Sequence, residues 1–242
     1  MAKTVFITGA SSGLGMGMAR EFAQRGYNLA LAARRSMEEF ARELTDSYSV
    51  NVKAYPLDVT DSEAVKDCLK QVSEEFYSLD IVIANAGIGV TTRIGEGDFE
   101  EVKATVDTNI VGLMATVEYA LPILRKQGFG QIVGLSSVAG ERGMPSIGVY
   151  CGSKSFVTTY LKALQLESAR EPIDVTILAP GYIDTPINQG AKSRPFVISL
   201  EKGSRELVDK IERKVSFSFV PGWPWAVVAR LMRCLPARFL AK

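Results

Sequence analysis

The sequence contains no histidine, which removes the side chain that most often moves protons in enzymes near neutral pH. It holds only three cysteines, Cys68, Cys151 and Cys234, and these lie far apart along the chain. Without histidine they cannot form the usual structural zinc sets, and an odd number argues against a disulfide scaffold. We therefore expect no metal site and a reduced, cytoplasmic protein.

The sequence also has no large excess of positive or negative charge and no long apolar run. The 28 lysines and arginines against 27 acids give a net charge of +1, so nothing in the overall charge favours nucleic acid as a partner. No uninterrupted apolar stretch is long enough to span a bilayer. A strand-like run at residues 4–8 begins too early to leave room for a signal peptide. The 242 residues, 47% hydrophobic, fit one globular domain over residues 1–242.

The first third of the chain predicts a strand, a glycine turn, a helix and a second strand. Residues 4–8 are apolar and β-rich, a helical pattern follows the glycines, and residues 28–33 form the next apolar run. Such a βαβ unit demands a parallel neighbour. The turn carries Gly9, Gly13 and Gly15, which allow backbone N–H groups to approach a pyrophosphate at the helix N-terminus. A glycine-rich turn without a ligand is the alternative.

The alternation of strands and helices continues to the end of the chain. We expect further strands at 52–57, 79–84, 131–135, 173–179 and 215–220, and further helices at 37–47, 60–76, 99–127, 150–170 and 205–214. The segment 99–127 predicts two helices or one long kinked helix, with Pro122 breaking its hydrogen-bond ladder near the end. Asn109 lies inside this segment, where its amide competes with the backbone, and the residues alone favour a satisfied buried asparagine.

Tyr150 and Lys154 stand four residues apart in a predicted helix, so their side chains share one face. A free phenol has a pKa of about 10, and a neighbouring ammonium group lowers it. We therefore expect a lowered pKa for Tyr150 and a proton shuttle near pH 7 that replaces the missing histidine. The competing interpretation is an ordinary solvated helix face, which is what most such pairs are.

These segments together resemble the short-chain dehydrogenase/reductase family, from Thr8 to about Gly222. The resemblance implies an α/β fold: a doubly wound, Rossmann-like parallel sheet of about seven strands with helices on both faces. Ala84 departs from the family, which has an extra asparagine there. The matching motifs are Thr8-Gly9-x-x-x-Gly13-x-Gly15, Asn85-Ala86-Gly87, Ser137 thirteen positions before Tyr150, Tyr150-x-x-x-Lys154 and Pro180-Gly181-x-x-x-Thr185.

The resemblance also implies roles for individual residues. Ser137, rather than Ser136, would bind a substrate carbonyl oxygen, and Tyr150 would donate the proton. Lys154 would hold the nicotinamide ribose, and Asn109 would distort its helix and anchor a water leading to that lysine. Without the family, Ser137 would be assigned as a turn cap and Asp58 as a helix N-terminal residue. The implied cofactor contacts are Gly9, Ser11, Ser12, Gly13, Leu14, Gly15, Asp58, Val59, Asn85, Ala86, Gly87, Tyr150, Lys154, Pro180, Gly181, Ile183 and Thr185.

The end of the second strand predicts which dinucleotide binds. NAD sites have an acid about 20 residues past the glycines, whereas arginine accommodates the 2′-phosphate of NADP. This chain has Arg34 and Arg35 there and no acid until Glu38. A guanidinium can bind the phosphate through two parallel hydrogen bonds. We therefore predict NADP(H), with Arg34 as first choice and Arg35 and Ser12 as helpers; two arginines on a surface turn are the alternative.

Two segments near the end remain open. Residues 188–200 are polar and punctuated by glycine and proline, which suits a substrate lid or a plain loop. Residues 223–242 form a basic, amphipathic extension in which Trp225, Val228, Met232 and Leu235 fall on one helical face, away from Arg230 and Arg233. Arg238 and Lys242 extend its basic character. It could pack on its own domain, form a dimer contact or touch a membrane peripherally; we favour the first two.

The residues and the resemblance together predict an NADPH-dependent carbonyl reductase, reversible as an alcohol dehydrogenase, acting on a small-molecule ketone or aldehyde. Small or aliphatic loop residues (Val138, Met144, Ile147 and Ile187), with Tyr182, indicate an apolar substrate. A NAD-linked dehydrogenase and a catalytically silent NADP-binding regulatory protein are the alternatives. The family also implies a homodimer or homotetramer.

Overall fold

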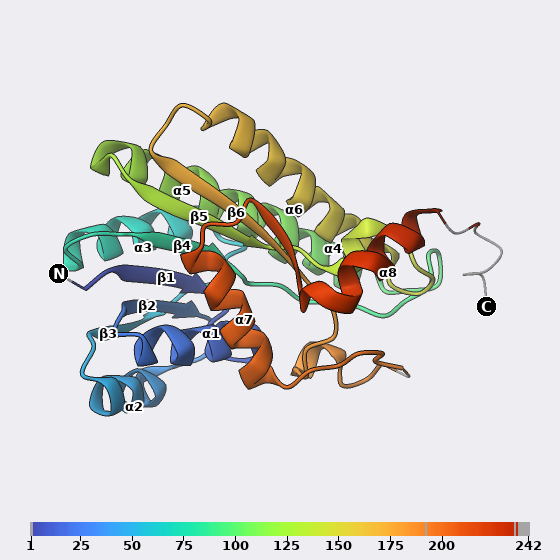
Figure 1. Cartoon of the computed structure of the whole chain (residues 1–242), viewed down its shortest axis with the longest axis horizontal. Helices are drawn as coiled ribbons and strands as arrows, with labels where there is room; N and C mark the ends of the chain where they lie inside the picture. Colours follow the sequence, from blue (N-terminus) through green and yellow to red (C-terminus); the bar gives the residue numbers. More distant parts are fainter. Residues whose placement is uncertain (1, 192, 235, 237–242) are drawn as a thin grey trace.

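The computed structural model describes residues 2–191, 193–234 and 236, and it shows one parallel sheet of seven strands in the order β3-β2-β1-β4-β5-β6-β7 (Figure 1). All strand pairings within it are parallel. The predicted doubly wound α/β fold is confirmed. The strands are β1 (Thr4–Thr8), β2 (Asn28–Ala33), β3 (Val52–Pro56), β4 (Ile81–Ala84), β5 (Gly130–Leu135), β6 (Ile173–Pro180) and β7 (Phe217–Val220).

Helices cover both faces of the sheet (Figure 1). Phe22 and Leu207 lie in the buried layer with α1, α2 and α7, whereas Leu69, Leu124 and Leu161 lie in the opposite layer with α3, α5 and α6. Because apolar layers cover both faces, β1 is buried along its whole length. The helices are α1 (Gly13–Gln24), α2 (Glu38–Tyr48), α3 (Ser62–Glu75), α4 (Phe99–Val106), α5 (Gly112–Gln127), α6 (Gly148–Glu167), α7 (Leu200–Glu212) and α8 (Gly222–Cys234), with short turns η1 (Asp107–Val111), η2 (Val138–Glu141) and η3 (Pro186–Asn188).

The strand order places the ligand-binding edge of the sheet. The chain runs outward from β1 to β3, then returns to pair β4 with the other side of β1. In open parallel sheets a ligand binds beyond the carboxyl ends of the strands at such a switch point. The loops after β1, β4, β5 and β6 therefore meet at one end of the molecule, on the right in Figure 1.

Two predicted features of the helices are wrong. Pro122 does not break its helix, because α5 continues through it to Gln127. The break in this segment is the π-helical turn η1, which contains Asn109. The second error concerns α7, which begins at Leu200 rather than Arg205 because the Ser199 side chain accepts a hydrogen bond from Lys202 N and caps it. The expected lid therefore ends before Leu200.

The C-terminal helix α8 packs on its own domain, at the carboxyl end of the strands (Figure 1). Trp225 and Ala229 are buried against Val138, with Val228 and Met232 beside them. The inward face predicted for the extension is thus confirmed for the residues that the structure describes, while Leu235, Arg238 and Lys242 lie outside them. In the described ranges, no helix combines the length and apolarity that crossing a bilayer requires.

Candidate active site

Lys154 projects from α6 into the sheet edge and is nearly fully buried. Its Nζ donates a hydrogen bond to Leu135 O at 2.8 Å, at the end of β5, and lies 5.7 Å from the centroid of the Tyr150 ring. The predicted shared helix face is therefore present and turned inward. Burial disfavours the ammonium form and lowers the pKa of Lys154 from 10.5 to about 8.

The pKa of Tyr150 shifts against the expectation from sequence. Part of the residue is open to solvent, yet enough protein surrounds the hydroxyl that desolvation raises its pKa, and hydrogen bonding with Ser137 only partly opposes this. The predicted lowering by Lys154 is wrong for this structure. The physical reason is that burial disfavours the charged form of both groups: it raises the pKa of the phenol and lowers the pKa of the Lys154 ammonium group. Tyr150 thus stays protonated near neutral pH, as a proton donor must.

The two serines after β5 have different surroundings. Ser136 is buried, and its hydroxyl donates to Lys154 O at 2.8 Å, which ties the end of β5 to α6. Ser137 interacts with the phenol of Tyr150, and its Oγ lies 3.3 Å from Pro180 O at the end of β6. Ser137 also caps η2 by accepting from Ala139 N at 3.1 Å. The preference for Ser137 over Ser136 agrees with this geometry, and the turn-cap role is present as well.

Asn109 lies in the π-helical turn η1 and is 1% exposed. Its amide holds the loop after β4: Oδ1 accepts from Ile88 N, and Nδ2 donates to Ile88 O, both at 2.8 Å. Nδ2 also lies 3.0 Å from Ser153 Oγ on α6. The helix distortion implied at Asn109 is confirmed, and its side chain is also satisfied by the protein, as the residues alone suggested.

The glycine loop after β1 is closed tightly against the loop after β4. A Cβ on Gly9, whose φ is +67°, would lie 2.8 Å from Ala86 Cα, and one on Gly15 would lie 2.4 Å from Gly9 O. Asn85 Nδ2 donates to Thr8 O at 2.8 Å, and Thr8 Oγ1 accepts from the backbone N–H groups of Asn85 and Ala86. The Thr8 hydroxyl, which was noted only as part of the motif, joins the two loops.

The loop after β4 also reaches Tyr150 and Lys154. A Cβ on Gly87 would lie 3.4 Å from Lys154 Nζ and 3.3 Å from Asn109 Oδ1, and one on Gly89 would lie 3.3 Å from the Tyr150 ring. Glycine at these positions therefore adds no side chain of its own beside Tyr150 and Lys154. The loop that follows β4 therefore forms one wall of the site.

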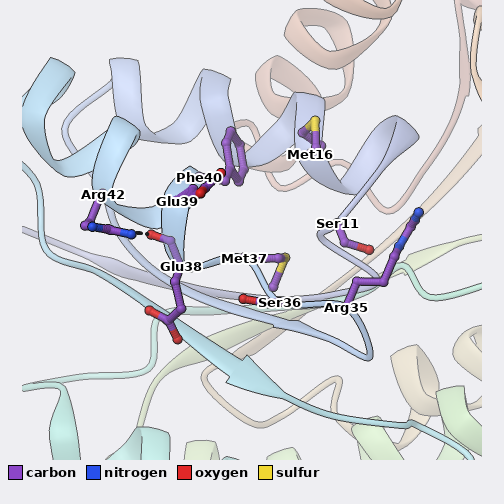
Figure 2. Close-up of a pocket in the computed structure, with 9 residues that line it drawn as sticks. All are labelled: Ser11, Met16, Arg35, Ser36, Met37, Glu38, Glu39, Phe40 and Arg42. Atoms are coloured by element: carbon purple, nitrogen blue, oxygen red, sulfur yellow. Dashed lines mark hydrogen bonds between the residues drawn. The ribbon is translucent and has the colours of Figure 1, made fainter.

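A cavity of about 580 Å³ lies between the glycine loop and the start of α2 (Figure 2). Arg35 extends along its rim beside Ser11, and Met37 and Phe40 lie farther in. Arg34 points elsewhere: it is exposed, and its Nη1 lies 4.0 Å from a carboxylate oxygen of Asp58. The two arginines therefore occupy different places, and Arg35 is the one that shares a cavity with the loop.

The remaining predicted cofactor residues surround the same loops. Asp58 accepts from Thr60 N and Oγ1, and these bonds, more than Arg34, hold the pKa of its carboxyl below the usual range. Asp61, not Asp58, caps α3. Val59 is buried against α5, where a Cβ on Gly112 would lie 2.6 Å from it. Ser12 is the N-cap residue of α1, and Leu14 packs on the core below.

The loop after β6 lies opposite the glycine loop. A Cβ on Gly13 would be 3.5 Å from Thr185 Cβ, so the two loops are in contact. Thr185 is buried and donates to Ile183 O at 3.1 Å. The segment expected to form a lid, residues 188–200, is anchored near its end. Ile198 N donates a hydrogen bond to Tyr182 O at 3.1 Å, and Ile198 forms an isolated β-bridge with Ile183.

Sequence reasoning missed the contacts that α8 makes with the loops of the site. Trp225 packs so closely on Gly181 that a Cβ there would lie 2.1 Å from its Nε1, and its ring meets Tyr182 edge-on at 5.9 Å. Arg233 pairs with Glu141, whose side chain is 3% exposed, in the turn that follows Ser137. No local pattern marks Glu141, because its burial depends on a helix 90 residues later in the sequence.

This chain is similar to known oxidoreductases in sequence and in fold. The profile described as short chain dehydrogenase matches residues 3–195 and so ends before α7. An uncharacterised oxidoreductase of Mycobacterium tuberculosis is 41% identical over 238 residues, covering 97% of this chain and 94% of that protein. An NADP-dependent 3-hydroxy acid dehydrogenase of Schizosaccharomyces pombe is 34% identical over 187 residues, covering 76% and 72% of the two chains. The solved alcohol dehydrogenase of the archaeon Thermococcus sibiricus, complexed with 5-hydroxy-NADP, has a TM-score of 0.82 at 30% identity, covering 90% and 96%.

Proposed function

This chain belongs to the short-chain dehydrogenase family, and on that basis we propose that it is an NADPH-dependent carbonyl reductase, reversible as an alcohol dehydrogenase, for apolar ketones or aldehydes. The observation that carries the proposal is the set of the buried Lys154 and the partly exposed Tyr150 and Ser137, next to a glycine loop that a Cβ would block. A protein that only bound the dinucleotide would have no need of a protonated phenol there.

The residues present fit a nicotinamide dinucleotide. Gly9 and Gly13 have positive φ, and Gly15 leaves room for the backbone to approach a pyrophosphate at the start of α1. Arg35 beside Ser11, with Arg34 nearby, supports a 2′-phosphate and hence NADP, because a guanidinium binds phosphate strongly. The rest of the dinucleotide would be held by the other predicted contacts, among them Asp58, Val59, Asn85 and Thr185.

When bound, the reduced nicotinamide supplies the hydride to the carbonyl carbon. Ser137 Oγ donates a hydrogen bond to the carbonyl oxygen and polarises it. Tyr150, kept protonated by its raised pKa, gives its proton to that oxygen as the alcohol forms. Lys154 holds the ribose and, with Asn109, lies on the route by which Tyr150 regains a proton. The reverse reaction uses the same groups.

The substrate class rests on the walls of the site. Val138 is buried against α8, and Ile187 lies at the mouth, where a Cβ on Gly89 would be 3.8 Å from it. Tyr182 adds an aromatic edge, and no charged side chain was predicted among these residues. An apolar ketone or aldehyde fits such walls better than a sugar or a charged acid does.

The test is the variant Tyr150→Phe, assayed with a panel of ketones and aldehydes by loss of NADPH absorbance. We expect turnover to fall by about 10²–10⁴-fold while NADPH affinity is kept, because only the proton donor is removed. Tyr160→Phe, on the same helix, is the control and should keep activity, since its hydroxyl pairs with Glu118 instead. Retained turnover in Tyr150→Phe, or an inert wild type over the whole panel, contradicts the proposal.

Cofactor choice is tested separately with Arg34→Ala and Arg35→Ala. We expect each to weaken NADPH binding about tenfold or more and to leave NADH binding little changed, because the lost guanidinium would pair with the 2′-phosphate, which NADH lacks. An unaltered NADPH-to-NADH ratio in both variants would support the NAD-linked alternative. Assembly as a homodimer or homotetramer is a further proposal from family membership, checked by light scattering.

A further inference from the structure

The helix α8 has a second face that the domain does not cover. While Trp225 and Ala229 are 5% and 1% exposed, Trp223, Val227 and Leu231 are 77%, 41% and 59% exposed. These three residues, four apart along the chain, are called the outer stripe. Val227 and Leu231 are one turn apart on the helical part of α8, whereas Trp223 precedes it with an extended backbone (φ −93°, ψ 135°) at a kink. A monomeric surface normally scatters large apolar side chains singly, so three in one segment of this length indicate a contact surface.

The charge around the outer stripe has one sign. After Glu212 the sequence contains no further acid up to Lys242, while Arg213, Lys214, Arg230, Arg233, Arg238 and Lys242 are basic. Arg230 is exposed next to the stripe, and Arg233 is 57% exposed although it pairs with Glu141. An apolar segment with tryptophan and leucine, bordered by Arg230 and with no acid of its own, has the composition of a helix that lies in a bilayer interface.

The helix α8, which carries the outer stripe, lies close to the mouth of the candidate active site. The ring of Phe196, in the expected lid, meets Trp225 edge-on at 5.9 Å, so the lid adjoins α8. Phe196 and its neighbour Val197 are themselves 55% and 42% exposed. Figure 1 shows α8 and the lid together at the carboxyl end of the strands. Apolar side chains from two separate segments therefore gather at the end of the molecule where the site opens.

We propose that the outer stripe docks on the surface of an anionic lipid bilayer, with the mouth of the site turned toward the lipid. Anionic headgroups complement Arg230, and Trp223 suits the headgroup level. A membrane-facing mouth suits apolar carbonyl compounds, in line with the proposed function. Docking is measured without turnover, so either proposal can fail while the other stands.

A second copy of the chain fits the outer stripe less well. In a two-fold contact the stripe would meet itself, which brings arginine toward arginine with no acid on the helix to pair with it. A stable interface also buries about 800 Å² per partner, and three side chains on one helix supply well under that area. The charge and size of the surface thus favour lipid over self-association.

The experiment uses the full chain with two kinds of vesicle, pure phosphatidylcholine and an equal mixture of phosphatidylcholine and phosphatidylglycerol. We expect cosedimentation with the mixed vesicles, weaker binding to the neutral ones, and loss of binding as salt is raised. Tryptophan emission should shift to the blue on binding, because Trp223 leaves water whereas Trp225 is already buried.

The variant Trp223→Ser/Leu231→Ser should lower the partition coefficient about tenfold or more while its melting temperature stays near wild type, because both side chains are exposed. The matched control is Leu166→Ser, which removes a leucine that is even more exposed (81% against 59% for Leu231) at the far end of α6, and it should bind as wild type does. Absence of binding to mixed vesicles, or binding that the double variant leaves intact, overturns the proposal. A drop in molecular mass by light scattering in the double variant also overturns it and assigns the stripe to a second copy.

Discussion

Lys154 should reduce the stability of the protein at neutral pH, and the variant Lys154→Met measures this. The side chain is nearly fully buried and has one protein hydrogen bond, to Leu135 O. Lowering its pKa from 10.5 to about 8 corresponds to about 3 kcal/mol against the charged form. The variant loses that cost but leaves a carbonyl unpaired, which costs about 1–3 kcal/mol. We expect a net gain of about 1 kcal/mol at pH 7, or a melting temperature about 2–4 °C higher.

The pH dependence decides whether this reasoning is right. Below pH about 8, Lys154 carries a proton in both the native and the unfolded protein, and the full cost of burying its charge is present. Between about 8 and 10.5 only the unfolded chain keeps the proton, so wild-type stability rises relative to the variant. The advantage of Lys154→Met should therefore shrink over that window and reverse above it.

The assay is thermal and urea unfolding of the protein without cofactor at pH 7, 9 and about 10.5, the last being the unshifted pKa. Lys162→Met is the control, because this lysine lies on the exposed side of the same helix and should show no such trend. Activity should be lost in Lys154→Met alone. A variant that is less stable at pH 7, with a difference that does not change with pH, would refute the account of a buried, desolvated ammonium group.

Three further variants examine the frame of the site. Gly9→Ala should lower the stability of the protein by more than 2 kcal/mol and weaken NADPH binding at least tenfold, because the new methyl group overlaps backbone atoms and the residue has a positive φ. Gly26 also has a positive φ but open space around it, so Gly26→Ala should lower stability by only about 1 kcal/mol in melting experiments. Asn109→Ala should lower stability by about 2–4 kcal/mol and turnover with it, because two backbone groups lose their partner; unchanged melting would contradict this. Arg233→Ala should cost about 1–2 kcal/mol by leaving Glu141 unpaired, and adding Glu141→Gln should restore part of the loss in a double-mutant cycle.

Much of the fold could be predicted because its signals are local. Each strand is a short apolar run, and the parallel sheet follows from their alternation with helices. Side chains four residues apart on a helix share a face whatever surrounds them, so the pairing of Tyr150 with Lys154 was also accessible. The errors fall where tertiary packing overrides propensity: α5 accommodates Pro122, and the distortion occurs instead at Asn109, whose amide bonds a distant loop.

The sequence by itself determined the order of the elements, the glycine loop and the presence of a phenol and an amine on one helix face, because these depend on neighbours along the chain. Only the tertiary structure decided that burial raises the pKa of Tyr150, that Arg35 rather than Arg34 shares a cavity with Ser11, and that α8 closes over the loops of the site. Desolvation, cavity walls and buried ion pairs arise from residues far apart in sequence, and no local pattern encodes which of them will meet.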